Sequence, residues 1–468
     1  MKIIKIATNT APDFDRNLIA SLPSSGPRYT SYPTADRFTG SFDAEAYIES
    51  LNMRKVGALN KPLSLYIHIP FCNTICYYCG CNKIITKDTS RADAYIEYLE
   101  KELALLAPHL NGRHPLVQLH FGGGTPTFLN DEQLERVFGL IRRYFDLLPN
   151  GEYSIEIDPR KVSRDTVLHL GKLGFNRMSV GIQDFDPVVQ QAVNRIQTVE
   201  ETREVIEAAR EAGFKSVSVD LIYGLPHQTL ESIKPTLDTV LSLDPDRLAL
   251  YHYAHLPHIF KPQRRIDTAV VPGSEEKLDI LQYAVHTLTS RGYVFIGMDH
   301  FAKPSDELSI ALKEGWLQRN FQGYSTYADC DLIAIGVSSI GKIGHAYIQN
   351  ERDIDAYYAA LDEGRLPVMR GYRLNGDDIL RRSIIQDLMC RFSLEFPTYE
   401  SLFNISFADY FSQELQDLQD LAELGLLRLK PGGLTVTPKG RFLIRNIAMV
   451  FDYHLRHKET TAQYSKTV

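Results

Sequence analysis

Four of the six cysteines lie within ten residues, in the segment YIHIPFCNTICYYCGCNK (66–83). Cys72, Cys76 and Cys79 have the spacing C-x3-C-x2-C, directly after a run that is typical of a strand. Zinc sites usually pair C-x2-C knuckles that lie far apart, and ordinary cubane clusters use four thiolates. Three thiolates on one loop would hold an iron–sulfur cluster and leave one iron without a protein ligand. The spacing therefore predicts a cluster with an open iron, and a structural zinc or iron–sulfur site is the alternative.

The other cysteines have different expected roles. Cys81 follows Cys79 by two residues, and a compact loop can hardly turn it onto the same corner of a cluster, so we expect it not to be a ligand. Cys330 and Cys390 stand alone and are typical of buried, small apolar residues. The N-terminus has no apolar core or cleavage site of a secretory signal. Clustered thiols in such a chain indicate metal or redox chemistry and not disulfides.

Further residues could complete a site for S-adenosylmethionine (SAM), whose amino and carboxylate groups can bind an open iron. Gly122–Gly124 end a predicted strand, and glycines let the backbone approach a ligand, although a tight strand-to-helix turn is the alternative. Glu156 and Asp220 suit ribose hydroxyls or an ammonium group, Gln183 lies similarly, and Arg195 can bind a carboxylate with two donors. Each of these four residues, taken alone, is more often a structural hydrogen-bonding residue than a ligand-binding one. Together, at the carboxyl ends of strands, they match where barrel active sites lie.

Strand-like and helical patterns alternate along the first 260 residues. The predicted strands are 64–69, 117–121, 153–157, 177–182, 217–222 and 247–253. The clearest predicted helices are 92–110, 131–145 and 198–214. The last begins with Thr198 followed three residues later by Glu201, which predicts a capping box. This alternation is typical of a parallel sheet or barrel with right-handed crossovers.

The strands also alternate between apolar and polar residues. Ile155 and Ile157 flank Glu156, and Val219 and Leu221 flank Asp220. A parallel sheet covered on both faces would be apolar throughout. We therefore predict an open or partial (β/α) barrel whose polar face lines a cavity. Polar residues that merely end the strands are the alternative, but this explains several strands less easily than one.

The pattern changes after residue 260. A connector (261–277), a helix (275–292) and a strand (293–298) come first, and helices follow at 377–392 and 407–425. Residues 426–430 and 434–437 then predict a hairpin across a Pro-Gly-Gly turn. Helices followed by a hairpin predict a winged-helix-like module. Such modules often bind DNA, but the mild local charge favours a lid or packing domain.

Composition excludes some classes of protein. A chain of 468 residues predicts two or three domains. With 51 basic and 58 acidic residues the net charge is −7, which argues against a nucleic-acid surface spread over the whole chain. The apolar runs are short and broken by charge, so we expect no membrane span and a cytoplasmic location.

Ten segments spread over nearly the whole chain can be compared with known families: GPRYTSYPTA (26–35), YIHIPFCNTICYYCGCNK, LHFGGGTPTFLN, SIEIDPR, FNRMSVGIQDF, VNRIQ, VDLIYGLPHQT, YHYAHLPHIF, GYVFIGMDHFAKP and LIRNIAMVFD. Taken together, these segments resemble the oxygen-independent coproporphyrinogen III dehydrogenase (oxidase) family of bacterial haem biosynthesis.

The resemblance implies a fold and a reaction. The fold is α/β, a partial (β/α)6 radical SAM barrel with an N-terminal extension and a mostly helical, winged-helix-like C-terminal domain. We place the extension or lid at 1–55, the barrel core at 56–260, barrel completion and a connector at 261–370, and the C-terminal domain at 371–468. The implied reaction is the oxidative decarboxylation, without oxygen, of two propionate side chains of coproporphyrinogen III to vinyl groups. A 5′-deoxyadenosyl radical drives it and protoporphyrinogen IX is the product.

The resemblance also assigns cofactors and residues. It implies one [4Fe–4S] cluster on Cys72, Cys76 and Cys79, and two SAM molecules. The residues at positions for the cluster-bound SAM are Tyr66, Gly123, Glu156 and Ile340, of which Tyr66 and Glu156 are the predicted catalytic residues. The residues at positions for the second SAM are Tyr78, Gly124, Thr125, Gln183, Arg195, Asp220 and Ala254. Position 78 is often Phe in the family, and Tyr keeps a ring there.

Arg28, in GPRYTSYPTA, is the candidate substrate residue. As part of a lid it would clamp a propionate, with Tyr29 and Tyr32 against the tetrapyrrole. As part of a strap packed on the barrel it would only form a surface ion pair, which is worth about 0–1 kcal/mol. Both interpretations stay open.

The expected partners are coproporphyrinogen III and an electron donor such as a flavodoxin or ferredoxin, with an unknown electron acceptor. We expect a monomer that binds neither nucleic acid nor membrane. One alternative function is a haem-binding chaperone of the same superfamily, but such relatives typically lack the fourth cysteine and the PRYTSYPTA segment. A DNA-binding regulator is the other. The sequence leaves open the reductant, the order of propionate oxidation and the roles of Cys81 and the C-terminal domain.

Overall fold

The computed structural model describes residues 12–22, 25–56, 62–110, 113–327 and 330–457. The chain divides into two compact units. We call Phe38–Gly273 with Asp329–Arg373 the barrel unit, and Met1–Arg37 with Ser274–Ala328 and Leu374–Val468 the terminal unit. Residues 1–11 and 23–24 of the predicted extension and 458–468 of the predicted C-terminal domain lie outside the described residues. The four predicted domain boundaries stay predictions.

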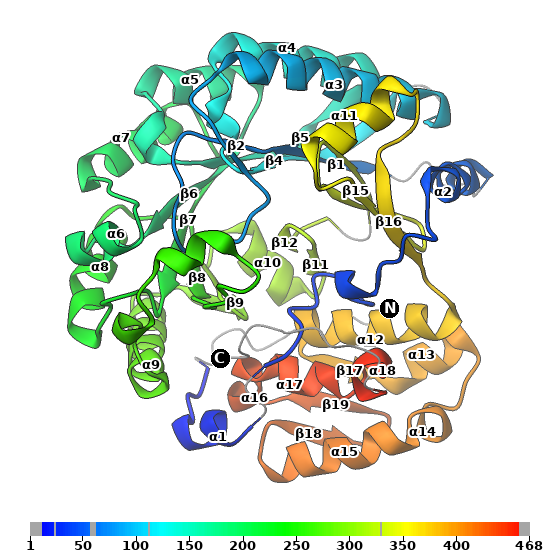
Figure 1. The fold of residues 1–468 in the computed structure, drawn as a ribbon. Coiled ribbons are helices and arrows are strands. Elements are labelled where there is room, and N and C mark those ends of the chain that lie inside the picture. The colour runs from blue at the N-terminus through cyan, green and yellow to red at the C-terminus, as the bar shows by residue number, and fades with distance from the viewer. Residues whose placement is uncertain (1–11, 23–24, 57–61, 111–112, 328–329, 458–468) are drawn as a thin grey trace. The chain divides into compact units, whose positions relative to one another are not determined.

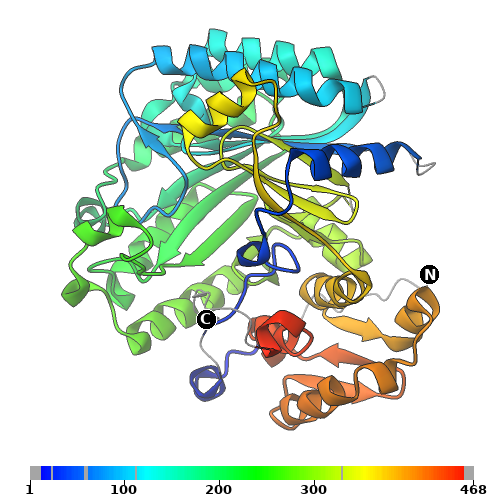
Figure 2. The same ribbon diagram turned by 45° about the vertical axis from the view of Figure 1, so that its right-hand side comes forward.

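A parallel sheet forms the centre of the barrel unit. Its strands follow the order β1 (Leu63–Ile69), β4 (His114–Gly123), β5 (Phe145–Ile157), β6 (Arg177–Gln183), β7 (Ser216–Tyr223) and β8 (Arg247–His252), and neighbours are parallel. The helices α3 (Ser90–Leu106), α4 (Asp131–Tyr144), α5 (Arg164–Leu173), α6 (Pro187–Ala192), α7 (Val199–Glu211) and α8 (Leu230–Ser242) connect them outside the sheet (Figure 1 and Figure 2). Every run that we predicted as a strand here is a strand, and the partial (β/α)6 barrel is confirmed.

Capping side chains fix where two of these helices begin. Thr198 Oγ1 accepts from the backbone N–H of Glu201 at 3.1 Å, and Glu201 Oε2 accepts from that of Thr198 at 2.9 Å, so the predicted capping box is present. Asn130 and Gln133 form the same arrangement at the start of α4. A capping box satisfies backbone N–H groups that the helix itself cannot. The loops that precede α4 and α7 therefore end at defined points.

The predicted division of the strands into two faces is confirmed in β5 and β7. Ile155 and Val219 are fully buried, whereas Glu156 and Asp220 are half-buried and line a cavity. Burying one aliphatic side chain contributes about 1.5–3 kcal/mol, so the apolar rows hold the sheet under its helices. The polar rows are thereby directed to the opposite side.

The sheet continues beyond β1. Strand β13 (Asp331–Ile335) pairs in parallel with β1, and β14 (Ile340–Ile343), β15 (Ala346–Asn350) and β16 (Val368–Arg373) follow as antiparallel neighbours. Helices α2 (Ala44–Val56) and α11 (Ile354–Asp362) belong to the same unit. Short 3-10 turns occur at η2 (Ala107–His109), η3 (Pro126–Phe128), η4 (Pro159–Lys161), η5 (Lys261–Arg265) and η6 (Thr268–Val270).

The terminal unit contains both ends of the chain. Its first elements are α1 (Arg16–Ser21), η1 (Ala35–Arg37), α9 (Ser274–Ser290), β9 (Val294–Gly297), β10 (His300–Ala302), α10 (Glu307–Glu314), β11 (Gln318–Asn320) and β12 (Gly323–Ser325). They are followed by α12 (Gly376–Arg391), β17 (Ser393–Glu395), α13 (Phe396–Phe403), α14 (Phe407–Tyr410), α15 (Ser412–Glu423), β18 (Leu427–Lys430), β19 (Gly433–Val436), α16 (Pro438–Phe442), α17 (Ile444–Met449) and α18 (Tyr453–Arg456).

The C-terminal part of this unit has the predicted winged-helix-like character. Strands β18 and β19 form the predicted antiparallel hairpin, and β17 pairs with β19 on its other side. The helix predicted at 407–425 is interrupted at Phe411, which lies between α14 and α15. Phe411 is fully buried against Phe407 and Phe451. Tertiary packing of this aromatic side chain coincides with the break that the apolar periodicity did not predict.

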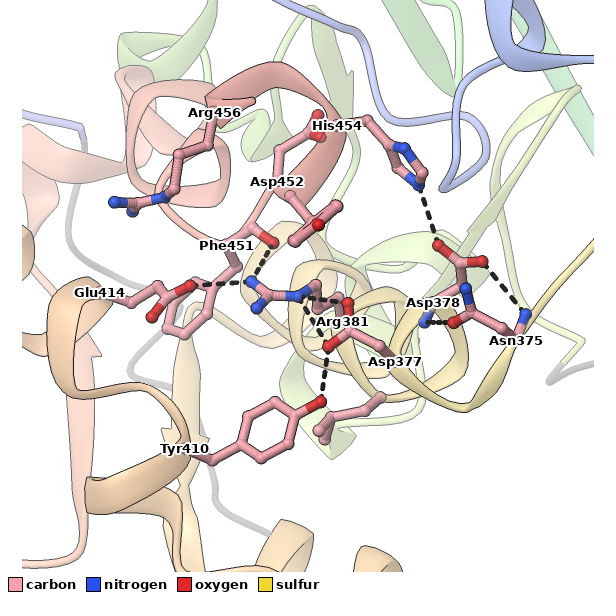
Figure 3. Close-up of polar contacts among 12 residues, drawn as sticks. Asn375, Asp377, Asp378, Arg381, Tyr410, Glu414, Phe451, Asp452, His454 and Arg456 are labelled. Atoms are coloured by element: carbon pink, nitrogen blue, oxygen red, sulfur yellow. Dashed lines mark hydrogen bonds and ion pairs between the residues drawn. The ribbon is translucent and has the colours of Figure 1, made fainter. Parts of the chain in front are cut away.

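Buried charges in the terminal unit are neutralised by one another (Figure 3). Arg381 of α12 donates from Nε to Asp377 at 2.8 Å and from Nη1 to Glu414 at 2.9 Å and the carbonyl of Phe451 at 3.1 Å. His454 Nε2 lies 2.9 Å from Asp378 Oδ1. These contacts connect α12 with α15 and the segment around α18. Among the described helices, none is both long and apolar enough to cross a membrane.

Candidate functional site

One cavity of about 300 Å³ in the barrel unit collects most of the predicted site residues. It lies where the strands β4 to β7 end and the cysteine loop begins. The predicted residues that line it are Cys72, Cys76, Tyr78, Cys79, Gly123, Gly124, Thr125, Glu156, Gln183, Arg195 and Asp220. Tyr66, Ala254 and Ile340 belong to the same unit but do not line the cavity. Arg28 belongs to the terminal unit.

Backbone hydrogen bonds fix the cysteine loop. Its ends pair as the short parallel strands β2 (Phe71–Cys72) and β3 (Ile84–Ile85). The N–H of Tyr77 donates to the carbonyl of Val193 at 2.9 Å, and Asn194 Nδ2 donates to the carbonyl of Ile75 at 2.7 Å. Lys83 Nζ donates to the carbonyls of Cys79 and Cys81 at 3.1 and 3.3 Å. With its polar backbone held in this way, the loop presents its thiols to the cavity.

The three predicted ligand thiols have different neighbours. Cys72 Sγ lies 3.4 Å from Thr125 Oγ1, and burial raises the pKa of the Cys72 thiol to about 11. Cys76 Sγ accepts from Arg195 Nη1 at 3.6 Å and from Arg160 Nη2 at 3.8 Å. A hydrogen bond from the thiol of Cys81 lowers the pKa of Cys79 to about 6. Cys81 thus lines the cavity as a neighbour of Cys79.

This donor set fits a cluster better than it fits one ion. Among the described residues, no three Cys, His, Asp or Glu side chains converge closely enough to bind a single metal ion. Thiolates of an iron–sulfur cluster bind different irons, so they need to face one cavity and not one point. Cys72, Cys76 and Cys79 line the same cavity from one loop.

The glycines of LHFGGGTPTFL allow other parts of the barrel unit to pack closely against this segment. A Cβ atom on Gly124 would lie 2.7 Å from the carbonyl oxygen of Pro70, and one on Gly122 would lie 2.9 Å from Glu156 Oε1. Gly123 has a φ of +117°, in the region that favours glycine. The segment therefore packs against the start of the cysteine loop and leaves room for the Glu156 carboxylate.

Glu156 is held from two sides. Its Oε1 lies 3.2 Å from His120 Nε2, and its Oε2 accepts from the N–H of Gly123 at 3.3 Å. His120 Nδ1 lies 2.6 Å from Ser154 Oγ, and the imidazole stacks on the ring of Tyr66, with centroids 5.8 Å apart. Tyr66 is thus linked to Glu156 through His120. Sequence reasoning did not single out His120, although it shares the polar face of β4.

Tyr66 also has a hydrogen-bond partner of its own. Burial lowers the pKa of His68, so its ring is neutral near pH 7. Its Nε2–H donates to the carbonyl of Asn82 at 3.0 Å, which leaves Nδ1 to accept from the hydroxyl of Tyr66 at 3.0 Å. The chain of contacts from Asn82 to Tyr66 therefore orients the phenol.

A second polar group lies on β6 and β7. Ser179 Oγ donates to Asp220 Oδ2 at 3.1 Å, and burial, with the nearby charge of Glu156, raises the pKa of Asp220 to about 7. Arg195 Nη2 donates to the carbonyl of Gly181 at 2.6 Å. Gln183 has a φ of +67°, an uncommon conformation for a residue other than glycine. The structure thus brings Gln183, Arg195 and Asp220 to one wall of the cavity.

Asp158 and Arg160 are cavity residues that sequence reasoning did not select. Asp158 follows β5 and caps the turn η4, and its carboxylate accepts from Arg160 Nη2 at 2.6 Å and from Arg195 Nη1 at 3.3 Å. Burial opposes ionisation of Asp158, but the hydrogen bond from Arg160 and the charge of Arg195 hold the pKa of this carboxyl below its usual value. Asp158 follows Glu156 by two residues and therefore belongs to the same polar row. This was the only feature of the sequence that pointed to Asp158 as a site residue.

The remaining predicted residues have other surroundings. The carbonyl of Ala254 accepts from Gln263 Nε2 at 3.1 Å, and the same amide donates to the carbonyl of Tyr78 at 3.0 Å. Ile340 begins β14. Arg28 forms an ion pair with Asp299, and its carbonyl accepts from Arg319 Nε at 3.4 Å.

Comparisons with known proteins agree with this arrangement. Residues 66–240 match the model of the radical SAM superfamily, and 374–443 match that of the HemN C-terminal domain. Oxygen-independent coproporphyrinogen III oxidase of Escherichia coli (strain K12) is 48% identical over 97% of this chain and 99% of its own length. The enzyme of the same description from Pseudomonas aeruginosa is 49% identical over 94% and 96%. The solved structure of the Escherichia coli coproporphyrinogen III oxidase, a radical SAM enzyme, superposes with a TM-score of 0.90 at 46% identity, covering 95% of this chain and all of the other.

Proposed function

We propose a function for this chain from one premise: it belongs to the family of oxygen-independent coproporphyrinogen III oxidases, which are radical SAM enzymes. The chain is therefore an enzyme and an oxidoreductase. Its family implies a [4Fe–4S] cluster and SAM. The reaction proposed is the oxidative decarboxylation of two propionate side chains of coproporphyrinogen III to vinyl groups.

Each decarboxylation has a simple balance. The β-carbon of a propionate loses a hydrogen atom, the carboxylate leaves as carbon dioxide, and one further electron passes to an acceptor. When bound and reduced, the cluster supplies the electron that cleaves SAM into methionine and the 5′-deoxyadenosyl radical, which takes the hydrogen atom. The protein binds and orients these molecules and excludes competing reactions.

The cysteine loop carries the proposal. We assign Cys72, Cys76 and Cys79 to the cluster, which leaves one iron for the amino and carboxylate groups of a SAM. Glu156 would accept a hydrogen bond from the amino group of that SAM, Tyr66 would act through its contact with His120, and Gly123 and Ile340 would complete the set. What supports this role is that Glu156 is half-exposed toward the cavity while His120 and the N–H of Gly123 hold its carboxylate.

A second SAM is part of the proposal. Its residues are Tyr78, Gly124, Thr125, Gln183, Arg195, Asp220 and Ala254. Support comes from the number of polar groups that line the cavity: besides Glu156 on β5, it is lined by Gln183, Arg195 and Asp220 on β6, β7 and the segment before α7. The link that Gln263 makes between the carbonyls of Tyr78 and Ala254 joins two members of this set.

Binding of labelled SAM to anaerobic, reconstituted protein tests the stoichiometry. We expect two SAM per chain in the wild type and one in Asp220→Ala. Asp238→Ala, which changes an exposed carboxylate on α8, is the matched control and should bind two. One SAM in all three proteins would contradict the assignment.

The activity itself is tested by incubating the reconstituted protein with SAM, a reductant and coproporphyrinogen III without oxygen. We expect protoporphyrinogen IX and 5′-deoxyadenosine, and neither from Cys76→Ala. A wild-type protein that holds haem but forms no product would favour the chaperone of the same superfamily instead.

The remaining partners, the location and the oligomeric state are also part of the proposal. We propose an electron donor such as a flavodoxin or ferredoxin, an acceptor of unknown identity, a cytoplasmic location and a monomer that binds neither nucleic acid nor membrane. Helix α15 has the sequence SQELQDLQDLAE, which contains acidic but no basic residues, so it is poorly suited to a phosphate backbone. Size measurement and binding to duplex DNA at physiological salt would test two of these points.

Arg28 stays a proposed propionate ligand, with the strap as its alternative. The neighbouring rings have structural partners: Tyr29 Oη donates to Asp452 at 2.9 Å, and Tyr32 Oη accepts from the N–H of Tyr453 at 3.0 Å. Both tyrosines are buried within the terminal unit. These contacts favour a strap for Tyr29 and Tyr32 and leave Arg28 as the residue to test.

A further inference from the structure

The sulfur of Cys76 has surroundings that the other two predicted ligands lack. Two guanidinium groups donate to it, from Arg195 at 3.6 Å and from Arg160 at 3.8 Å. The Cys72 sulfur instead lies 3.4 Å from a neutral hydroxyl, that of Thr125. Both arginine side chains are about nine-tenths buried, 8% and 12% exposed. Lys83 lies near Cys79 and its charge helps to lower the pKa of that thiol, while its Nζ donates to the backbone carbonyls of Cys79 and Cys81. Cys76 differs in that two buried guanidinium groups donate to its sulfur.

Asp158 aims both guanidinium groups. Arg160 binds its carboxylate with two donors, Nε at 2.9 Å and Nη2 at 2.6 Å, and the N–H of Arg160 donates to it at 3.2 Å. Arg195 shares the same carboxylate. Pro159 lies between Asp158 and Arg160, at the start of the turn η4. The two-donor contact between Arg160 and Asp158 is therefore formed within a rigid segment of three residues.

The two arginines share one carboxylate. Both bind Asp158, and the charge of Arg195 also acts on Asp220, which lines the same cavity. An arrangement that served only stability would pair each buried cation with its own carboxylate, as unpaired buried charge is costly. Here the two guanidinium groups share Asp158 and direct further donors to a sulfur on the cavity wall.

Such donors affect a cluster in a definite direction. Reduction adds negative charge that is spread over the sulfurs, and hydrogen bonds to sulfur help to set the reduction potential. Donors that carry charge act more strongly than neutral ones, and burial increases their effect. We propose that Arg160, oriented by Asp158, raises the reduction potential of the cluster through the Cys76 sulfur, together with Arg195. Arg160 is thus a positioning and tuning residue, and this inference rests on the proposed ligand role of Cys76.

Arg160→Met removes the charge and the donors while keeping a long side chain. The matched control is Lys161→Met, which removes one positive charge from the adjacent residue on the wall of the same cavity. Reconstituted proteins would be titrated with a low-potential reductant under electron paramagnetic resonance. We expect the midpoint potential of Arg160→Met to shift downward, and by more than that of Lys161→Met. Iron and sulfide content should match the wild type.

Arg160→Gln is the second variant, because it removes the charge but keeps an amide donor. We expect a smaller downward shift than in Arg160→Met. Equal potentials in the wild type and Arg160→Met, or equal shifts in Arg160→Met and Lys161→Met, would overturn the proposal. So would loss of the cluster from both Arg160 variants, since Arg160 would then be needed to hold the cluster and not to tune it. Absence of the cluster from the wild type would instead overturn the proposed function.

Discussion

Buried arginines have opposite surroundings in the two units. Arg381 in the terminal unit lies between Asp377 and Glu414 and also donates to a backbone carbonyl (Figure 3). Two carboxylates therefore neutralise its positive charge within the protein. In the barrel unit, Arg160 and Arg195 share the single carboxylate of Asp158 and both donate to the Cys76 sulfur, and Arg195 also donates to the carbonyl of Gly181. Residue type and burial are the same in both units. The partners distinguish a charge that stabilises the fold from one that is available for chemistry.

Cysteine substitution should give the largest difference between the units. Cys76→Ala removes a proposed cluster ligand, so we expect loss of the cluster and of all detectable activity, as in Cys72→Ala and Cys79→Ala. Cys390→Ala changes a thiol that is fully buried in the terminal unit. It should keep the cluster and cost about 1–2 kcal/mol of stability. Iron and sulfide analysis with electron paramagnetic resonance decides.

Cys81→Ala sharpens this comparison within one loop. Because Cys81 is expected not to be a ligand, the variant should retain the cluster even if turnover falls. A cluster that survives loss of Cys76 but not of Cys81 would contradict the ligand assignment.

Removal of an arginine that has two carboxylates of its own should cost more stability than removal of one that shares its carboxylate with a second arginine. Arg381→Met leaves Glu414 and Asp377 without their cation, which typically costs about 3–5 kcal/mol. Arg195→Met leaves Asp158 still bound by Arg160, so we expect less than half that loss. Urea denaturation of the cluster-free proteins measures both. Equal losses would mean that the two sites do not differ in the way proposed.

Glu102 on α3 predicts a dependence of stability on pH. This fully buried carboxylate accepts from the N–H of Gly336, Asn350 Nδ2 and Tyr357 Oη, and burial raises its pKa from 4.5 to about 7. The folded protein therefore holds a proton that the unfolded chain releases at lower pH. The stabilisation is complete below pH 4.5 and is lost as the pH rises through 7, by an amount of about 3 kcal/mol.

Glu102→Gln removes the titrating group. Comparing the variant with the wild type at each pH therefore isolates the contribution of Glu102. The difference in the free energy of unfolding between wild type and variant should fall as the pH rises from 4.5 to 7. A difference that stays constant over this range would show that the pKa of Glu102 is not raised.

The smallest expected effect separates the two interpretations of Arg28. If its guanidinium binds a propionate, Arg28→Ala should raise the KM for coproporphyrinogen severalfold, whereas Asp299→Asn should leave KM unchanged. Loss of their ion pair alone should cost each variant about 1 kcal/mol of stability or less. Equal stability losses with an unchanged KM in both variants would make the segment a strap.

The sequence predicted the barrel and its polar face well, because both depend on local periodicity. The alternation around Glu156 and Asp220 identified residues that line the cavity, and the spacing of the cysteines identified the loop. Strands β13 and β15 are buried along their whole length, so they show no alternation and were not named.

Other features had no signal that periodicity can carry. The contact between Arg160, in the turn η4, and Cys76 joins residues that lie 84 positions apart in the chain. Ala254 and Ile340 have no polar side chain, so only the family resemblance could propose them as SAM residues. By contrast, His120 shares the polar face of β4, so the alternation of that strand did carry a signal for it that was not used.

Transfer of hydrogen from substrate to cofactor is the most direct test of the account. The reconstituted protein would be given SAM, a reductant and coproporphyrinogen III that carries deuterium on the β-carbons of its propionates. Mass spectrometry would then compare 5′-deoxyadenosine with the vinyl product. We predict that deuterium appears in 5′-deoxyadenosine in step with product formation. Vinyl product accompanied by unlabelled 5′-deoxyadenosine, or formed without it, would contradict the account.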